Sequence, residues 1–127
     1  MADITKLRTA VIEKQEIILN RLTKLSYEEV IQMMASLSSL ITNLDKIQAE
    51  EEVQCNRIMV REMEKDVRTN FSKAEAILKS TETYLSYKNI MSLKQCASRA
   101  LSLSRLHIQH LLESRVSGDH EIDDNGH

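Results

Sequence analysis

Hydrophobic residues recur at steps of three and four along most of this 127-residue chain, with charged and polar residues between them. This spacing is typical of amphipathic α-helices, and the period-two alternation of β-strands is missing. Helix breakers do not interrupt the pattern, because proline is absent and both glycines, Gly118 and Gly126, lie near the C-terminus. The pattern therefore predicts an all-α fold.

The boundary between the first two predicted helices is the most clearly marked in the chain. The first helix is expected to run from Ile4 to about Lys24. Ser26 and Glu29 then have the spacing of a capping box, in which the serine hydroxyl and the glutamate carboxylate each satisfy a backbone amide. The second helix is therefore predicted to begin at Ser26.

An acidic run interrupts the apolar pattern between residues 49 and 56. The run contains three consecutive glutamates, Glu50 to Glu52, but no glycine or proline that would force a turn. Either the chain reverses near this run, or one continuous helix passes through it as a rod over residues 27 to 85. The rod would need a second chain to cover it, as in a coiled-coil dimer. We favour the turn.

Two more helices are predicted after this turn. The third is expected to start near Val60 and to end at Lys88 and Asn89, and the fourth to run from Ile90 to about Arg115. Four helices joined by short connections favour an up-and-down antiparallel helical bundle. Dimerisation through a coiled coil remains open.

Composition supports one globular domain. Apolar residues make up 42% of the chain and charged residues 28%, with a net charge of −2. We expect residues 1–116 to form a single bundle and residues 117–127 a disordered acidic tail. Cys55 and Cys96 form no Cys-x-x-Cys pair, and we identify neither a signal peptide nor an apolar run of roughly 20 residues. A soluble cytoplasmic protein is predicted.

The fourth predicted helix has apolar residues on two sides. One side carries the main apolar stripe, which we expect to pack in the core of the bundle. A second side carries the predicted interaction face. The alternative is that the residues of this second side are ordinary surface or partly buried positions, since exposed leucines are common. The predicted interaction face consists of Cys96, Arg99, Leu103, Leu106 and His110.

No motif indicates an enzyme. His107 and His110 lie one turn apart, but no further ligand motif completes a metal site, so we expect no metal, no cofactor and no small-molecule substrate. The basic residues form no continuous stripe and the net charge is slightly negative, which argues against binding nucleic acid. We expect a non-enzymatic interaction module, such as an adaptor, small chaperone or assembly subunit, that binds a protein partner or forms a homo-oligomer.

Two resemblances supply alternatives. Arg105 and His110 are similar to the Arg-x4-His motif of HEPN ribonucleases, helical bundles that dimerise and act on the RNA phosphate and 2′-hydroxyl; this chain has Leu106 where that family usually carries a polar residue. The layout of residues 18 to 68 resembles the N-terminal oligomerisation helices of H-NS-type nucleoid proteins. That resemblance implies a coiled-coil oligomerisation protein or an antagonist of such proteins, because no DNA-binding segment like that family's follows.

Overall fold

The computed structural model describes residues 4–65 and 70–125, with side chains described as far as residue 114. These residues form four α-helices and one short 3-10 helix, and no strand. The helices are α1 (Thr5–Arg21), the 3-10 helix η1 (Leu22–Lys24), α2 (Tyr27–Lys65), α3 (Phe71–Lys79) and α4 (Glu82–Asn125). The predicted all-α helical-bundle fold is confirmed.

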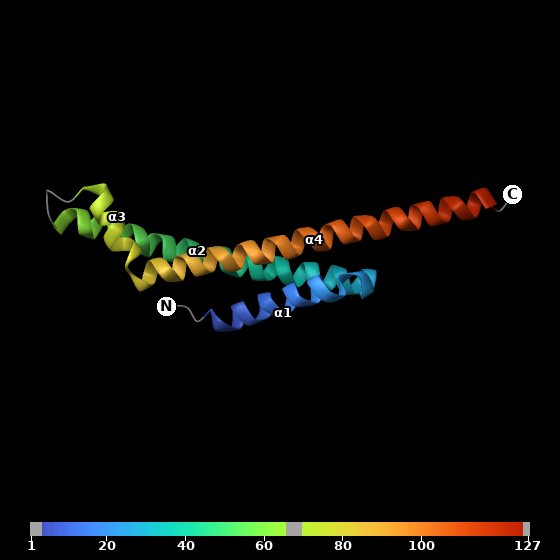
Figure 1. Ribbon diagram of the computed structural model, residues 1–127, viewed down its shortest axis with the longest axis horizontal. Helices are drawn as coiled ribbons and strands as arrows, with labels where there is room; N and C mark the ends of the chain where they lie inside the picture. Colours follow the sequence, from blue (N-terminus) through green and yellow to red (C-terminus); the bar gives the residue numbers. More distant parts are fainter. Residues whose placement is uncertain (1–3, 66–69, 126–127) are drawn as a thin grey trace.

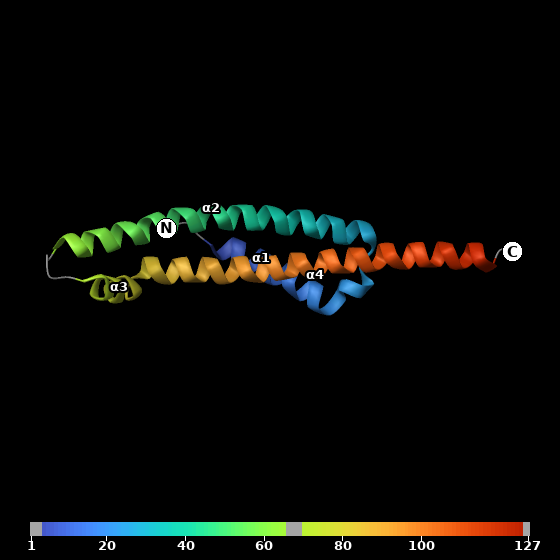
Figure 2. The same ribbon diagram turned by 90° about the horizontal axis from the view of Figure 1, so that it is seen from above.

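Two long antiparallel helices, α2 and α4, form the body of the molecule (Figure 1). α1 lies along one half of this pair and runs in the same direction as α4, while α3 lies at the far end of α2 (Figure 2). The bundle is therefore long and narrow, with three helices side by side only where α1 is present.

The start of α2 is stabilised by the predicted capping box. The backbone amide of Glu29 donates to the Ser26 hydroxyl at 3.2 Å, and the backbone amide of Ser26 donates to the Glu29 carboxylate at 3.2 Å. These two bonds satisfy donors that have no partner within the first turn of a helix. The predicted boundary at Ser26 is confirmed.

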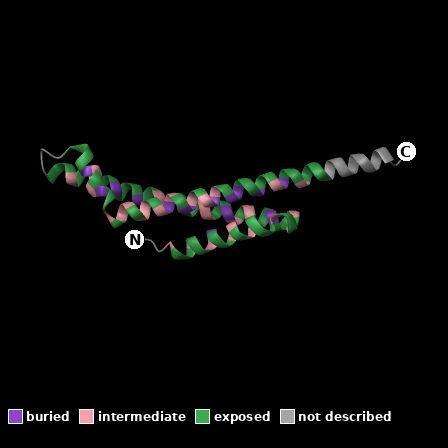
Figure 3. Cartoon of the chain, in the orientation of Figure 1, coloured by how far each residue is buried: buried purple, intermediate pink, exposed green. Residues whose placement is uncertain are grey.

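The core follows a seven-residue repeat on α2. Val30, Leu37 and Leu44 succeed one another at this interval, and all three are fully buried. Figure 3 shows buried positions along both long helices, α2 and α4. A repeat of seven keeps one stripe of a helix facing a neighbouring helix. The buried cluster joins two of these side chains to α1 and α4, and comprises Val11, Ile18, Leu37, Leu44, Ile90, Leu93, Ala97, Ala100 and Leu101.

The turn favoured at the acidic run is wrong. α2 continues from Tyr27 to Lys65 without a break. Glu51 takes the buried position seven residues after Leu44, and its carboxylate accepts a hydrogen bond at 3.0 Å from the hydroxyl of Ser86 in α4. α4 of the same chain thus covers the helix that was expected to need a second chain. The single rod over residues 27 to 85 is not formed either, because α2 ends at Lys65 and the chain returns through α4.

The later helix boundaries also differ from the prediction. α4 passes through Asn89 without a break, and the break falls at Thr81 instead. The Thr81 hydroxyl donates to the carbonyl of Leu78 at 2.6 Å and accepts from the amide of Tyr84 at 3.2 Å. A threonine that caps a helix in this way marks its start. The predicted third helix is therefore divided among α2, α3 and the beginning of α4.

α4 extends further than the sequence predicted. It continues to Asn125, past the expected end near Arg115 and through residues 117–125 of the segment predicted to be a disordered tail. This stretch contains no proline, and a glycine such as Gly118 costs a helix only about 1 kcal/mol. The sequence thus contains no residue that forces the helix to end, and residues 126–127 lie outside the described part.

Candidate interaction surface

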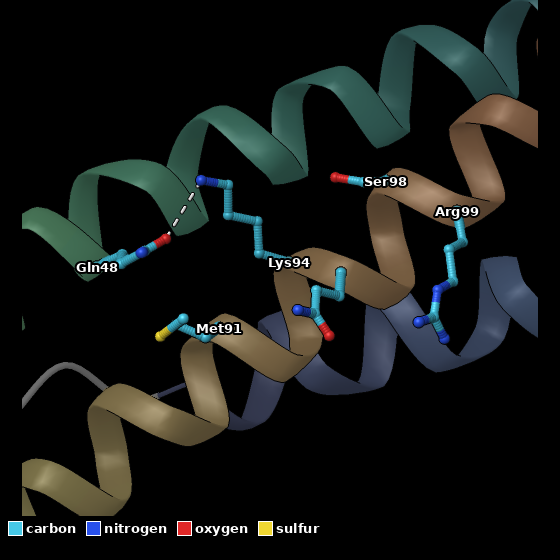
Figure 4. Close-up of a pocket in the computed structure, with 6 residues that line it drawn as sticks. Gln48, Met91, Lys94, Ser98 and Arg99 are labelled. Carbon is cyan, nitrogen blue, oxygen red and sulfur yellow. Dashed lines mark hydrogen bonds between the residues drawn. The ribbon is translucent and has the colours of Figure 1, made fainter.

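The side of α4 that faces α2 carries a polar contact as well as the core. The Lys94 ammonium forms an ion pair with Asp45 and a hydrogen bond of 3.2 Å with the amide oxygen of Gln48 (Figure 4). Met91 and Ser98 lie on the same side and help to line a shallow, open hollow beside these groups. Because the lysine charge is already paired across the two helices, we assign this contact to the pairing of α2 with α4.

The structure divides the predicted interaction face of α4. Cys96 is half-buried and packs against the core cluster, so it belongs to the interior rather than to a free surface. Arg99 and His110 are exposed. Leu103 and Leu106 are also exposed, with 43% and 61% of their surfaces in contact with solvent. Four of the five predicted residues therefore lie on the outside of α4.

Two exposed residues of α1 were missed by the sequence analysis. Ile12 and Leu19 are 44% and 68% exposed and lie seven residues apart, hence on one flank of the helix. The opposite flank, which includes Ile17 and Arg21, borders α2 and lines a shallow hollow with it. Since α1 packs against both α2 and α4, the flank that carries Ile12 and Leu19 is the one nearer α4.

The positions of residues along the helix axes can be compared between α1 and α4. Leu25, just after α1, and Leu111 of α4 line the same hollow, so the two residues lie at one level. α1 and α4 run parallel and rise by the same distance per residue. Leu19 precedes Leu25 by six residues, so it is level with about residue 105 of α4, which precedes Leu111 by six residues. Leu19 is therefore level with the turns of α4 that carry Leu103 and Leu106. We call Ile12, Leu19, Leu103 and Leu106 the α1–α4 face.

Basic side chains adjoin this face. Exposed Arg8 precedes Ile12 by one turn, and exposed Arg99 precedes Leu103 by one turn. His110 follows Leu106 at the same spacing, whereas Glu16 is the acidic residue beside Ile12. The edge of the face therefore carries more basic than acidic groups. Such an edge favours a partner with acidic residues around an apolar centre.

The sequence contains a signal for the exposed α1 residues. Ile12 and Leu19 repeat at seven residues, as the core positions Val11 and Ile18 do, but they lie one residue further along. A second apolar row beside the main stripe widens the apolar side of a helix beyond what one neighbour can cover. The same reasoning identified Leu103 on α4.

The residues considered for catalysis do not converge within one chain. Arg105 and His110 are both exposed on α4, and five residues along a helix place two side chains about 140° apart. One ring nitrogen of His107, Nε2, is buried and has no hydrogen-bond partner. Among the residues described, no group of three or more histidine, cysteine, aspartate or glutamate side chains is placed to hold a metal ion.

Cys55 lies in surroundings that disfavour its thiolate. It is buried on α2, one turn after Glu51. Burial raises the pKa of the Cys55 thiol, and the negative charges of Glu51 and Glu52 raise the pKa further. The thiolate is the reactive form of cysteine, so these surroundings make Cys55 a poor nucleophile.

Comparisons with protein-family models, with curated proteins and with solved structures found no match in any of the three. A search of the described helices for one long and apolar enough to cross a bilayer found none.

Proposed function

We propose that this chain is a non-enzymatic protein-interaction module that binds a partner protein through the α1–α4 face. The observation that carries the proposal is the exposure of Leu103 and Leu106 on α4 together with that of two apolar residues on the neighbouring helix α1. Single exposed leucines are ordinary on protein surfaces, but an apolar group contributed by two adjacent helices is typical of binding sites.

The shape of the molecule supports this proposal. Its accessible surface is 9004 Å², whereas a compact monomer of 14.6 kDa would expose roughly 6,900 Å² by the usual scaling with mass. The difference arises because the bundle is long and mostly two helices wide (Figure 1). Long helical surfaces of this kind suit adaptors, small chaperones and assembly subunits, which bind partners along helix faces.

The chemistry of the face indicates the kind of partner. Its centre is aliphatic and its edge carries Arg8 and Arg99. An amphipathic helix with acidic flanks would bury the leucines and place carboxylates near the arginines. Oppositely charged edges mainly increase the rate of association and the specificity for one partner, while the buried apolar centre provides most of the affinity.

Affinity capture from the native host, quantified by mass spectrometry, tests the proposal. The test variant is Leu103→Ser with Leu106→Ser. The chain offers a matched control in Leu85→Ser with Leu112→Ser, because these leucines also lie on α4 and have the same exposures, 61% and 43%. Leu85 is about 27 Å from Leu103 along the helix, and Leu112 points to another side of α4.

The proposal expects the test variant to lose a partner that the wild type and the control retain. Far-ultraviolet circular dichroism should show the same helix content in all three proteins, since the substituted side chains lie outside the core. Equal recovery of every captured protein by the test variant and the control would contradict the proposal.

A further inference from the structure

One end of the α2–α4 pair has no third long helix beside it. α1 accompanies the opposite end, as both views show (Figure 1, Figure 2). Leu25 and Leu111 lie at one level, and Thr5 precedes Leu25 by 20 residues, so α1 begins level with about residue 91 of α4. Ser86 and its partner Glu51 lie beyond this point. We call residues 51–65 and 71–89 the α3 end.

The interior of the α3 end contains few large apolar side chains. Its buried residues, among those described, are Glu51, Cys55, Ala74 and Leu78, and Leu78 is the one large aliphatic residue among them. The nine residues of the core cluster all lie outside this end. Larger side chains of the α3 end are instead more than 40% exposed, namely Val53, Val60, Met63, Phe71 and Leu85. Burial of apolar surface therefore stabilises this end less than the part beside α1.

The contact that joins the two long helices at the α3 end is a buried polar one. Glu51 is 7% exposed, and its carboxylate accepts a hydrogen bond of 3.0 Å from the neutral hydroxyl of Ser86. The ion pairs found among the described residues do not include Glu51. Closing this end therefore takes a carboxylate out of water without a cation beside it, and opening returns the carboxylate to water.

We propose that the α3 end opens and closes while the part of the bundle beside α1 stays folded. In the open form the bond between Glu51 and Ser86 is broken and the Cys55 thiol is exposed to solvent. The core cluster still holds α1 to the remaining parts of α2 and α4. Such local opening requires less free energy than global unfolding, because it exposes only part of the buried surface. The α1–α4 face lies in the part that stays folded.

Hydrogen exchange of the whole chain, measured on peptides by mass spectrometry, tests this proposal. After correction for intrinsic rates, amides of residues 51–65 and 71–89 should exchange about tenfold faster, or more, than those of residues 30–47 and 93–108. Their exchange should also depend less on urea than global unfolding does, because less surface is exposed. Alkylation of Cys55 by iodoacetamide should show the same weak dependence on urea.

Two substitutions examine the two parts of the bundle separately. Glu51→Leu removes the buried carboxylate and should slow exchange at the α3 end about fivefold. Ala97→Gly lies in the core cluster and weakens the middle of α4, so it should speed exchange of residues 30–47 and 93–108 about fivefold. It should leave exchange at the α3 end unchanged, because the closed and the locally open forms both contain the folded core and are destabilised equally.

Three results would overturn the proposal. The first is equal protection of the amides in the two parts of the bundle. The second is an Ala97→Gly variant in which exchange at the α3 end rises as much as elsewhere, since the whole chain would then unfold as one unit. The third is a Glu51→Leu variant in which exchange at the α3 end is no slower. Circular dichroism with the helix content of the wild type checks that each variant folds.

Discussion

Replacing Glu51 with leucine should make the protein more stable. Glu51 lies 7% exposed at the position that continues the buried series Leu37 and Leu44. A leucine there would bury a side chain worth about 1.5–3 kcal/mol. The replacement loses the hydrogen bond from Ser86, and a hydrogen bond to a charged group contributes about 1.5–3 kcal/mol. It also removes the free-energy cost of holding a carboxylate away from water. We expect a net gain of about 1 kcal/mol.

The complementary change, Ser86→Ala, should destabilise the protein. It keeps the buried carboxylate of Glu51 and removes a hydrogen-bond donor to it, which costs about 1–3 kcal/mol. Glu51→Gln is the matched control, because the amide oxygen still accepts a bond from Ser86 and the side chain keeps its size. This control should change stability by less than the other two variants.

Urea unfolding followed by circular dichroism measures all three effects as changes in the unfolding free energy. Ser86→Ala combined with Glu51→Leu should be nearly as stable as Glu51→Leu alone, because the leucine no longer needs the hydroxyl. The reasoning would be refuted if Glu51→Leu were less stable than the wild type by 1 kcal/mol or more. The carboxylate would then stabilise the pairing of α2 with α4 by more than its hydrogen bond explains.

Three further predictions follow from single residues. Ser26→Ala should cost about 1 kcal/mol in unfolding free energy, since it removes the hydroxyl that caps α2, and an unchanged value in urea would contradict the capping role. Leu101→Ser should cost about 2–5 kcal/mol because Leu101 is in the core, against less than 1 kcal/mol for exposed Leu106→Ser, and equal losses would show that both sides of α4 are buried. Buried Cys55 should react with iodoacetamide more slowly than half-buried Cys96 in the folded protein, and equal rates would contradict this. The free energy of unfolding should fall as the pH rises above the ordinary cysteine pKa, because the raised pKa of Cys55 keeps its thiol protonated in the folded chain after the unfolded chain ionises. The Cys55→Ala variant should lose less stability at alkaline pH than the wild type, and an equal loss in both proteins would contradict this.

Local signals in the sequence predicted the fold class and the start of α2. The pairing of Ser26 with Glu29 is contained in four consecutive residues, so its two hydrogen bonds could be read directly. The burial of Glu51 could not be predicted from local sequence, because it depends on Ser86, which is 35 residues away in sequence. Without knowledge of a distant partner, an acidic run is typical of an exposed turn. The predicted end of the second helix was therefore placed at the acidic run.

The break before α4 was missed for a different reason. Thr81 lies within the range predicted for the third helix, where it interrupts the apolar series, although threonine is a favoured cap. The sequence alone indicated the outer position of four α4 residues, Arg99, Leu103, Leu106 and His110, because the position of a side chain around a helix depends on residue number alone. The contribution of Ile12 required knowing which helix lies beside α4, and that follows from tertiary packing.

Site-specific photocrosslinking in the native host tests the central claim most directly. A photoreactive residue is placed at Leu106 in one protein and at Leu112 in another, since both leucines are exposed on α4 and only the first belongs to the α1–α4 face. The account predicts a covalent adduct with one heterologous protein from position 106 and none from position 112. Adducts of equal yield from both positions, or from position 112 alone, would contradict binding through this face.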